Sequence, residues 1–326
     1  MFPDVPAYDP RLRSREARHP YERKRLVMAV SWLTLLFVVF LGTLAATDLA
    51  ALLWTILLIV VVVVSIWIFM RFWNARLLGR AVKVTSESFP ELHAEIVRLR
   101  SMLDYHRPID VYVADDVDGK MTITSLLGTR VLLIEGGFAA DLQAEGPAPF
   151  RFLLGSFISY LKARHGQLAI YVIILERLKW AAVIDPWLLP YERSAEYTRD
   201  QIGYLCAGDL NASLGVISRL TVGKEFAGKV EPAGVLEQAC RVARSPLSRL
   251  AEVCQAMPHM VNRYVNLITY AAAMRPADFE RYRAGLTDKG RERLGELLTQ
   301  SPHHRNRPAT WTPRQATGGS RPRGAT

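Results

Sequence analysis

The chain has 326 residues, half of them hydrophobic, and a formal net charge of +10, which is enough sequence for one sizeable domain with appendages. Its three widely spaced cysteines (Cys206, Cys240 and Cys254) exclude a disulfide framework and a cysteine metal cluster and favour a reducing compartment. The positive charge lies mainly in the termini and in residues 71–83, whereas residues 84–300 are close to neutral. A nucleic-acid-binding domain would carry such charge on a folded face, so we expect no nucleic-acid partner.

The N-terminal part predicts a membrane anchor. Residues 1–25 are polar and carry seven Lys or Arg against four Asp or Glu, so we expect a basic cytoplasmic tail without regular structure. Two uncharged apolar runs follow, Leu26–Ala46 and Leu49–Met70, separated by Thr47-Asp48. Each run has roughly the 20 residues that a helix needs to cross a bilayer. Residues 26–70 therefore predict a two-helix transmembrane hairpin that turns at Asp48.

Basic residues flank the outer ends of both runs and predict the orientation of the hairpin. Arg23, Lys24 and Arg25 precede the first run, and the linker of residues 71–83 adds four more Lys or Arg. The positive-inside rule then places both termini and the main domain in the cytoplasm, at the inner or plasma membrane. The same flanks predict contact with anionic lipids. A cleaved signal peptide is the alternative, but no small-residue cleavage site separates the runs, and a second apolar run follows at once.

The first half of the main domain, residues 84–300, predicts a helix followed by three strands. Ser88 and Glu91 have the spacing of a capping box, with Pro90 inside the first turn. A helical stripe of apolar residues indicates core packing; it consists of Leu92, Ile96, Leu99 and Leu103. Strands are predicted at three places and a helix near Phe138; the strands are Ile109–Ala114, Met121–Ser125 and Val131–Glu135.

The second half predicts helices only. Phe150–Ile184 is a long apolar run that suggests one helix or two in succession, ended by Asp185-Pro186 and Pro190. Within it, Leu168–Leu175 is too short to span a bilayer and indicates a buried or membrane-skimming segment. Further helices are predicted at Arg193–Gly203, Leu210–Leu220 (capped by Asp209), Val235–Val242, Leu247–Ala256, Met260–Met274 and Pro276–Leu298. Residues 301–326 contain five Arg and no acid, which predicts a disordered basic tail.

The helix around Leu154–Gly166 lies where a zinc peptidase would carry His-Glu-x-x-His. In that motif two His on one helix face hold the metal and the Glu activates a water. Here the corresponding stretch is Ser156-Phe157-Ile158-Ser159-Tyr160. A Ser hydroxyl is a poor zinc ligand, a phenol with a pKa of about 10 must first lose its proton, and a Phe cannot act as a base. We expect no catalytic residue at positions 156, 157 and 160, and we expect Phe157 to fill the place of a metal.

Three further stretches surround this mismatch: Arg164-His165-Gly166, Arg193-x-x-Glu196-Tyr-x-x-Asp200, and Met257-Pro258 through Arg263. Their order, behind a membrane hairpin and a short β region, resembles the membrane zinc metallopeptidases of the HtpX and CAAX prenyl protease type over roughly residues 84–275. The resemblance implies a mainly helical α+β domain of gluzincin type. It also implies that Glu196 is a remnant metal ligand and that Arg193, Asp200, His165 and Arg263 support it.

Two departures from the family pattern bear on this site. Arg199 stands where the family has Ala, and His165 lies too far along its helix from Ser156 to replace a ligand. The plainer alternative is that Glu196 and Asp200 form a solvated acidic face paired with Arg193 and Arg199.

The resemblance and its departures together imply a membrane-anchored, metallopeptidase-like protein that is catalytically inactive. Such a protein would bind a peptide or a membrane-protein partner, or regulate one, and we expect no cofactor. The strand Val131–Ile134 is expected to offer an edge to an extended peptide. An active membrane zinc metalloendopeptidase with an unusual, zinc-binding site is one alternative, and an unrelated membrane scaffold is another.

Overall fold

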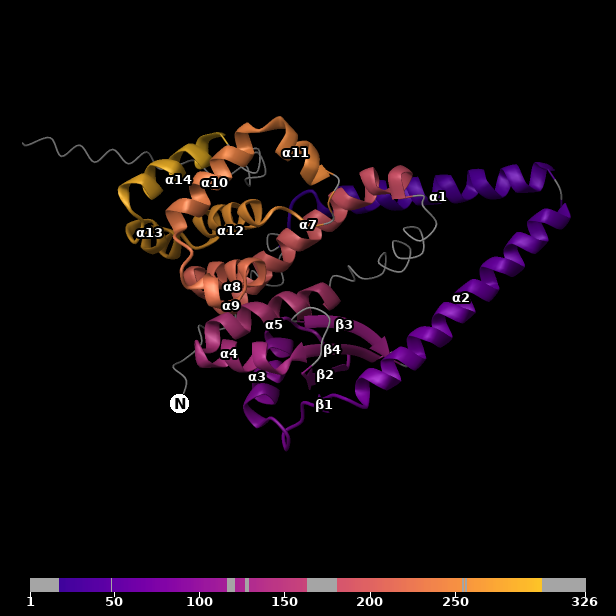
Figure 1. Ribbon diagram of the computed structural model, residues 1–326, viewed down its shortest axis with the longest axis horizontal. Helices are drawn as coiled ribbons and strands as arrows, with labels where there is room; N and C mark the ends of the chain where they lie inside the picture. The colour runs from indigo at the N-terminus through magenta and orange to yellow at the C-terminus, as the bar shows by residue number, and fades with distance from the viewer. Residues whose placement is uncertain are drawn as a thin grey trace, which may run out of the picture.

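The computed structural model describes residues 18–47, 49–115, 121–126, 129–162, 181–253, 255 and 257–300. It is mainly helical: two long N-terminal helices project from a helical body that packs beside one small mixed sheet (Figure 1). This arrangement confirms the expected mainly helical α+β class. The tail residues 1–17 and 301–326, the turn residue Asp48, and the predicted segment Leu168–Leu175 lie outside the described residues.

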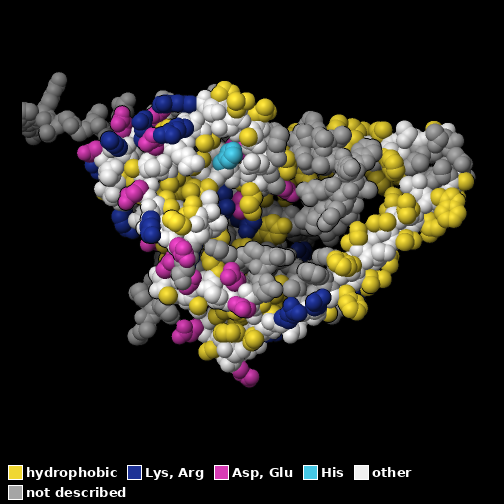
Figure 2. Space-filling model, viewed as in Figure 1, with side chains coloured by type: hydrophobic (Ala, Val, Ile, Leu, Met, Phe, Trp, Pro, Cys, Tyr) yellow, Lys and Arg dark blue, Asp and Glu magenta, His cyan; other side chains and the backbone are white. Residues whose placement is uncertain are grey.

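The two projecting helices are α1 (Glu22–Thr47) and α2 (Leu49–Leu78). α1 is long and apolar enough to serve as a membrane span or a signal sequence. The apolar part of α2, Leu53–Phe69, is shorter. Both helices expose most of their large hydrophobic side chains, and Figure 2 shows these side chains along the length of α2. Exposed apolar surface of this extent marks a membrane or protein contact.

The sheet contains β1 (Val82–Lys83), β2 (Ile109–Ala114), β3 (Met121–Leu126) and β4 (Thr129–Glu135), in the order β1-β2-β4-β3. β2 and β4 are parallel, and β3 and β4 are antiparallel. β4 therefore lies inside the sheet, and the expectation that Val131–Ile134 offers a free edge is wrong. Four consecutive buried apolar residues, 131–134, are typical of a central strand that is covered on both faces. The outer strands are β1 and β3.

The helical body follows in the order of the chain. α3 (Pro90–Met102), α4 (Gly136–Ala144) and α5 (Pro147–Lys162) pack close to the sheet in Figure 1. The remaining helices are α7 (Ala181–Ala207), α8 (Leu210–Val222), α9 (Lys224–Ala227), α10 (Pro232–Arg244), α11 (Pro246–Val253), α12 (Met260–Met274), α13 (Pro276–Ala284) and α14 (Asp288–Gln300). One continuous hydrophobic core joins these helices, apart from α9 and α11, to the sheet. α7 packs against α5, α8 and α12 and also contacts α1, so it connects the body to the projecting pair.

The beginnings of two helices test the predicted caps. Asp209 caps α8 as expected, because its Oδ1 accepts a hydrogen bond from the Ala212 N–H at 3.0 Å. The capping box at Ser88 is wrong: Pro90 is the first helical residue, so Phe89 occupies the N-cap position. The Ser88 hydroxyl instead accepts from the Thr85 N–H at 2.9 Å and donates to the Lys83 carbonyl at 2.6 Å. The apolar stripe on α3 is buried as predicted.

α7 is one helix of 27 residues, so the expectation that Pro186 and Pro190 end a helix is wrong. A proline inside a helix removes one backbone hydrogen bond, but contacts with α1 support this stretch. The Pro190 carbonyl accepts from Ser194 Oγ at 2.7 Å and from Arg25 Nη1 at 3.1 Å. Leu188 and Tyr191 are buried against α1. Tertiary packing thus overrides the local preference.

The predicted C-terminal helix Pro276–Leu298 is two helices, α13 and α14, separated at Gly285–Thr287. Leu286, in the break, is buried in the core. Turning the chain at this point lets the helical stripes of both α13 and α14 face the same core, because Phe279, Tyr282, Leu294 and Leu297 are all buried.

Candidate functional site

The candidate site lies where α5 crosses α7, and two glycines permit the close approach. A Cβ atom on Gly155 of α5 would lie 2.7 Å from Cβ of Cys206, and one on Gly203 of α7 would lie 2.7 Å from the carbonyl oxygen of Phe152. Such separations are far shorter than a van der Waals contact. The two backbones can therefore lie this close only because neither glycine has a side chain. This contact sets Ser156–Tyr160 of α5 against Glu196–Asp200 of α7.

We expect Gly203→Ala to destabilise the protein by about 2 kcal/mol, because the new methyl group would overlap a helix backbone that cannot move cheaply. Gly215→Ala is a matched control, since Gly215 is also inside a helix (α8) but has no atom within 4 Å of its missing Cβ. There the gain in helix propensity should stabilise the protein by up to about 1 kcal/mol. Denaturation of both variants in detergent micelles measures the difference. Equal effects would show that the α5–α7 contact is looser than described.

The α5 side of the site carries Ser156, Phe157 and Tyr160, the three positions that the sequence resemblance aligns with a zinc-peptidase motif. Ser156 is buried, and its hydroxyl donates to the Leu153 carbonyl of the same helix at 2.8 Å. Phe157 and Tyr160 are half-buried and lie under the guanidinium of Arg199, whose Cζ is 4.8 Å and 5.2 Å from the two ring centroids. Contact of a guanidinium with two aromatic faces is a favourable cation–π arrangement.

Arg199 also forms an ion pair inside the site. Its Nη1 lies 2.6 Å from Oε2 of Glu196, and the two side chains are 17% and 10% exposed. A side-chain cation is therefore held between the aromatic pair of α5 and the carboxylate of α7. The sequence suggested a solvated pair for Arg199 and missed this position. Two features of the sequence could have indicated it. Glu196 lies three residues before Arg199, and Phe157 and Tyr160 have helical spacing on the preceding helix.

A second arginine, Arg263 of α12, joins the same cluster. Its Nε and Nη2 atoms lie 2.8 Å and 2.7 Å from the two carboxylate oxygens of Asp200, a bidentate pair of the strongest kind. Its Nη2 also lies 3.4 Å from Oε1 of Glu196. Burial raises the pKa of Asp200, and Arg263 opposes that shift. Burial likewise disfavours the charge on Arg263, but Asp200 and Glu196 keep its pKa above the ordinary value.

The structure thus brings Glu196, Asp200 and Arg263 together from two helices, beside Phe157 and Tyr160. Arg193 lies one turn earlier on α7 and points elsewhere, donating from Nη1 to the carbonyls of Glu252 and Gln255, both at 2.8 Å. It therefore fastens the end of α11 to α7. His165 lies outside the described residues.

The donor groups at the site do not fit a zinc ion, which needs three or four strong N, O or S ligands. The Ser156 hydroxyl is bound to its own helix. Burial raises the pKa of Tyr160, with Arg199 opposing, so the phenol keeps its proton at neutral pH. Glu196 is already paired with two guanidinium groups. Within the described part of the chain, no group of three or more His, Cys, Asp or Glu residues is placed to hold a metal.

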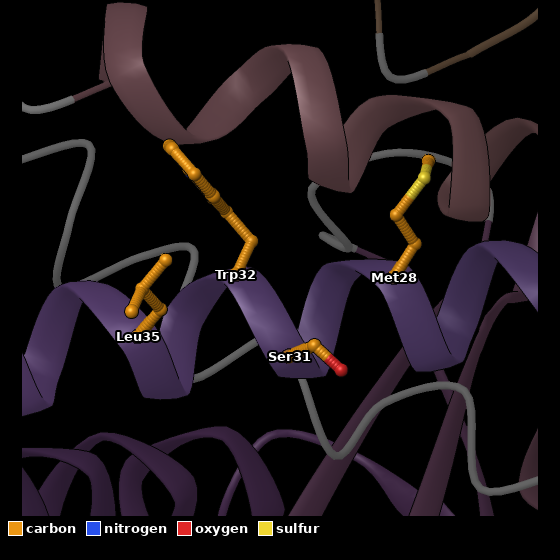
Figure 3. Close-up of a pocket in the computed structure, with 4 residues that line it drawn as sticks. All are labelled: Met28, Ser31, Trp32 and Leu35. Carbon is orange, nitrogen blue, oxygen red and sulfur yellow. The ribbon is translucent and has the colours of Figure 1, made fainter.

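The opposite face of α7 contacts the start of α1 and the residues just before it. The His19 N–H donates to Thr198 Oγ1 at 2.9 Å, the Thr198 hydroxyl donates to the buried carboxylate of Glu22, and Arg25 Nη1 donates to Ser194 Oγ. Further along α1, an open apolar hollow is lined by Met28, Ser31, Trp32 and Leu35 (Figure 3). One face of α7 therefore carries the charge cluster, and another face binds the first turn of α1.

Comparisons with protein-family models, with curated proteins and with solved structures find no significant match to this chain. The fold and the site define a mainly helical protein with a small mixed sheet, an N-terminal apolar helix, and a closed cluster of two acids and two arginines between α5, α7 and α12.

Proposed function

We propose that this protein is a membrane-anchored, metallopeptidase-like protein that binds a peptide or a membrane-protein partner and does not hydrolyse it. The observation that carries the proposal is the Arg199 guanidinium, held against Phe157, Tyr160 and Glu196. In a zinc peptidase the corresponding helix positions surround the metal. Here the Arg199 guanidinium lies between the side chains at these positions and Glu196. No group at positions 156, 157 or 160 can activate a water.

We propose β3, in place of the expected β4, as the strand that binds the partner. Among the described strands, β4 pairs on both sides, whereas β3 pairs with β4 alone and also contacts α2. An outer strand can accept an extended peptide through its backbone groups, and the alternate side-chain pockets then give specificity. A peptide or a membrane-protein segment bound in this way needs no metal and no catalytic group.

The metal content of the full-length protein, purified in detergent without chelators, tests the proposal that the site holds no zinc and is catalytically inactive. We expect zinc well below one equivalent in the wild type, and no change on Glu196→Ala. Arg241→Ala serves as a control for purification, since Arg241 is exposed and lies on α10, away from the site. One equivalent of zinc that disappears with Glu196→Ala would favour the alternative, an active membrane zinc metalloendopeptidase with an unusual donor set.

The proposed localisation is the inner or plasma membrane, with α1 and α2 as a two-span hairpin and both termini in the cytoplasm. Support comes from the exposed apolar surface of both helices and from the Lys and Arg residues outside each apolar run. Anionic lipids are the proposed lipid partners, because each basic residue near such a surface contributes about 1 kcal/mol.

A reporter that is active only in the periplasm tests this topology. Fused after residue 84, it should give no signal, because the second span returns the chain to the cytoplasm. Fused after residue 48, between α1 and α2, it should give a strong signal. A strong signal at residue 84 would contradict the hairpin, and a weak one at residue 48 would show that α1 does not cross the membrane.

A further inference from the structure

α11 and the residues that follow it expose large apolar side chains on the helical body. Leu247 and Leu250 are 77% and 62% exposed, and Met257 is 62% exposed. Leu247 and Leu250 are three residues apart, so they lie on one face of the helix. Figure 2 shows hydrophobic side chains at the edge of the body where Figure 1 places α11. Large exposed apolar side chains that are grouped in this way indicate a contact surface.

The hydrogen bonds of α7 place the end of α11, next to this face, level with the start of the apolar part of α1. Arg193 of α7 holds the carbonyls of Glu252 and Gln255 at the end of α11. One turn of the same helix, Pro190 to Ser194, holds the side chain of Arg25, after which the uncharged run of α1 begins. If α1 crosses a bilayer, Arg25 marks the cytoplasmic surface, and the end of α11 lies at that surface.

The charge of this surface suits lipid. Glu252 is the only acidic residue in residues 245–260, and it is turned inward. Its two carboxylate oxygens accept from Asn262 Nδ2 at 2.9 Å and 2.8 Å, and Oε1 also accepts from the His259 N–H at 3.3 Å. The outer face of α11 is thus free of acid. A short helix with apolar residues outward and no acidic side chain there is suited to an anionic interface.

We propose that Leu247, Leu250 and Met257 insert into the cytoplasmic interface of the bilayer, where α11 acts as a third membrane contact beside the hairpin. This inference rests on the proposed membrane anchoring of α1 and α2. The α11 contact would fix the position of the helical body relative to the membrane. The contact between α1 and α7 already ties the body to the hairpin, and a contact at α11, fastened to α7 by Arg193, adds a second point that fixes the tilt of α7 relative to the membrane. The charge cluster at Glu196 and Asp200 is then held close to the membrane surface.

Photo-crosslinking in the full chain tests the inference. Benzoylphenylalanine is introduced separately in place of Leu250, of Val60 in α2, and of Phe226 in α9. The protein is reconstituted in vesicles of phosphatidylcholine and phosphatidylglycerol. Phe226 is a matched control, since it is 60% exposed and apolar but lies on α9, which packs on α8. We expect lipid adducts by mass spectrometry at positions 250 and 60 and none at position 226.

The outcomes separate this inference from the one on which it rests. Adducts at position 60 without adducts at position 250 would overturn the α11 contact and leave the hairpin intact. No adduct at position 60 would overturn the hairpin and the α11 contact together. A product of twice the mass from position 250 would show that α11 covers a second copy of the chain and would also overturn the lipid contact. Leu247→Glu should lower the adduct yield at position 250, whereas Phe226→Glu should leave it unchanged.

Discussion

Replacing Arg263 with Met will lower the free energy of unfolding by about 3–5 kcal/mol, because it leaves a buried carboxylate without its partner. Asp200 is 1% exposed, and both of its oxygens are bound by Arg263. Methionine keeps much of the volume of the side chain, so packing changes little and the measured loss reflects the charge. Denaturation of the full-length protein in detergent micelles, followed by circular dichroism, provides the measurement.

The loss should depend on pH. Burial already raises the pKa of Asp200, and Arg263 is the largest influence that opposes the rise, so its removal raises the pKa further. A carboxyl whose folded-state pKa exceeds its unfolded value favours the folded state at low pH, and this contribution is lost as the pH rises through the folded pKa. The Arg263→Met variant should therefore lie nearer to the wild type at pH 5 than at pH 8.

Two controls make this prediction specific. Adding Asp200→Asn to Arg263→Met should restore part of the stability at pH 8, because it removes the unpaired charge, and should flatten the pH dependence. Arg241→Met removes an exposed ion pair with Glu237 and should have no measurable effect. An Arg263→Met protein as stable as the wild type at pH 8 would mean that Asp200 reaches water or another partner when Arg263 is absent.

Patterns within single elements predicted the fold well. The strands at Ile109–Ala114 and Val131–Glu135, the helix Met260–Met274 and the cap at Asp209 are all confirmed, since each depends on its own stretch of sequence. Two of the errors have a common cause, which is packing between elements that are distant in the sequence. α7 continues through Pro186 and Pro190 because α1, more than 150 residues earlier, packs against it, and β4 is central because β2 and β3 pair on its two sides.

The candidate site was predicted less completely, for a similar reason. The spacing of Glu196 and Asp200 put both acids on one helix face, but no local pattern identifies Arg263 as the group that binds Asp200 through both oxygens. Arg199 was interpreted from its neighbours on α7 alone. Its place over Phe157 and Tyr160 depends on the close crossing at Gly155 and Gly203, which the sequence of neither helix shows by itself.

Zinc binding can be built into the site only if Arg199 is removed as well. The changes Ser156→His, Phe157→Glu and Tyr160→His supply the two His ligands and the base of a zinc peptidase helix. Glu196 would be the third ligand, but Arg199 lies 2.6 Å from its Oε2 and would oppose a divalent cation beside it. Arg263 lies farther from Glu196, 3.4 Å from its Oε1, and is paired with Asp200. We therefore expect weak or no zinc binding by this triple variant. One equivalent is expected once Arg199→Ala is added, measured as metal per protein after gel filtration.

Stability provides a second readout of the same design. Without metal, the fourfold variant should be less stable than the wild type, because a Glu and two His replace groups that are buried or half-buried. Saturating zinc should restore about 2.7 kcal/mol at a free concentration one hundred times the Kd. Arg199→Ala alone should bind no zinc and gain nothing from it, and Glu196→Ala in the fourfold variant should abolish both effects. Equal zinc binding by the triple and fourfold variants would show that Arg199 does not hold the metal position. A folded fourfold variant that binds no zinc, or that binds it without Glu196, would contradict the correspondence of these positions with a metallopeptidase zinc site. It would favour an unrelated membrane scaffold.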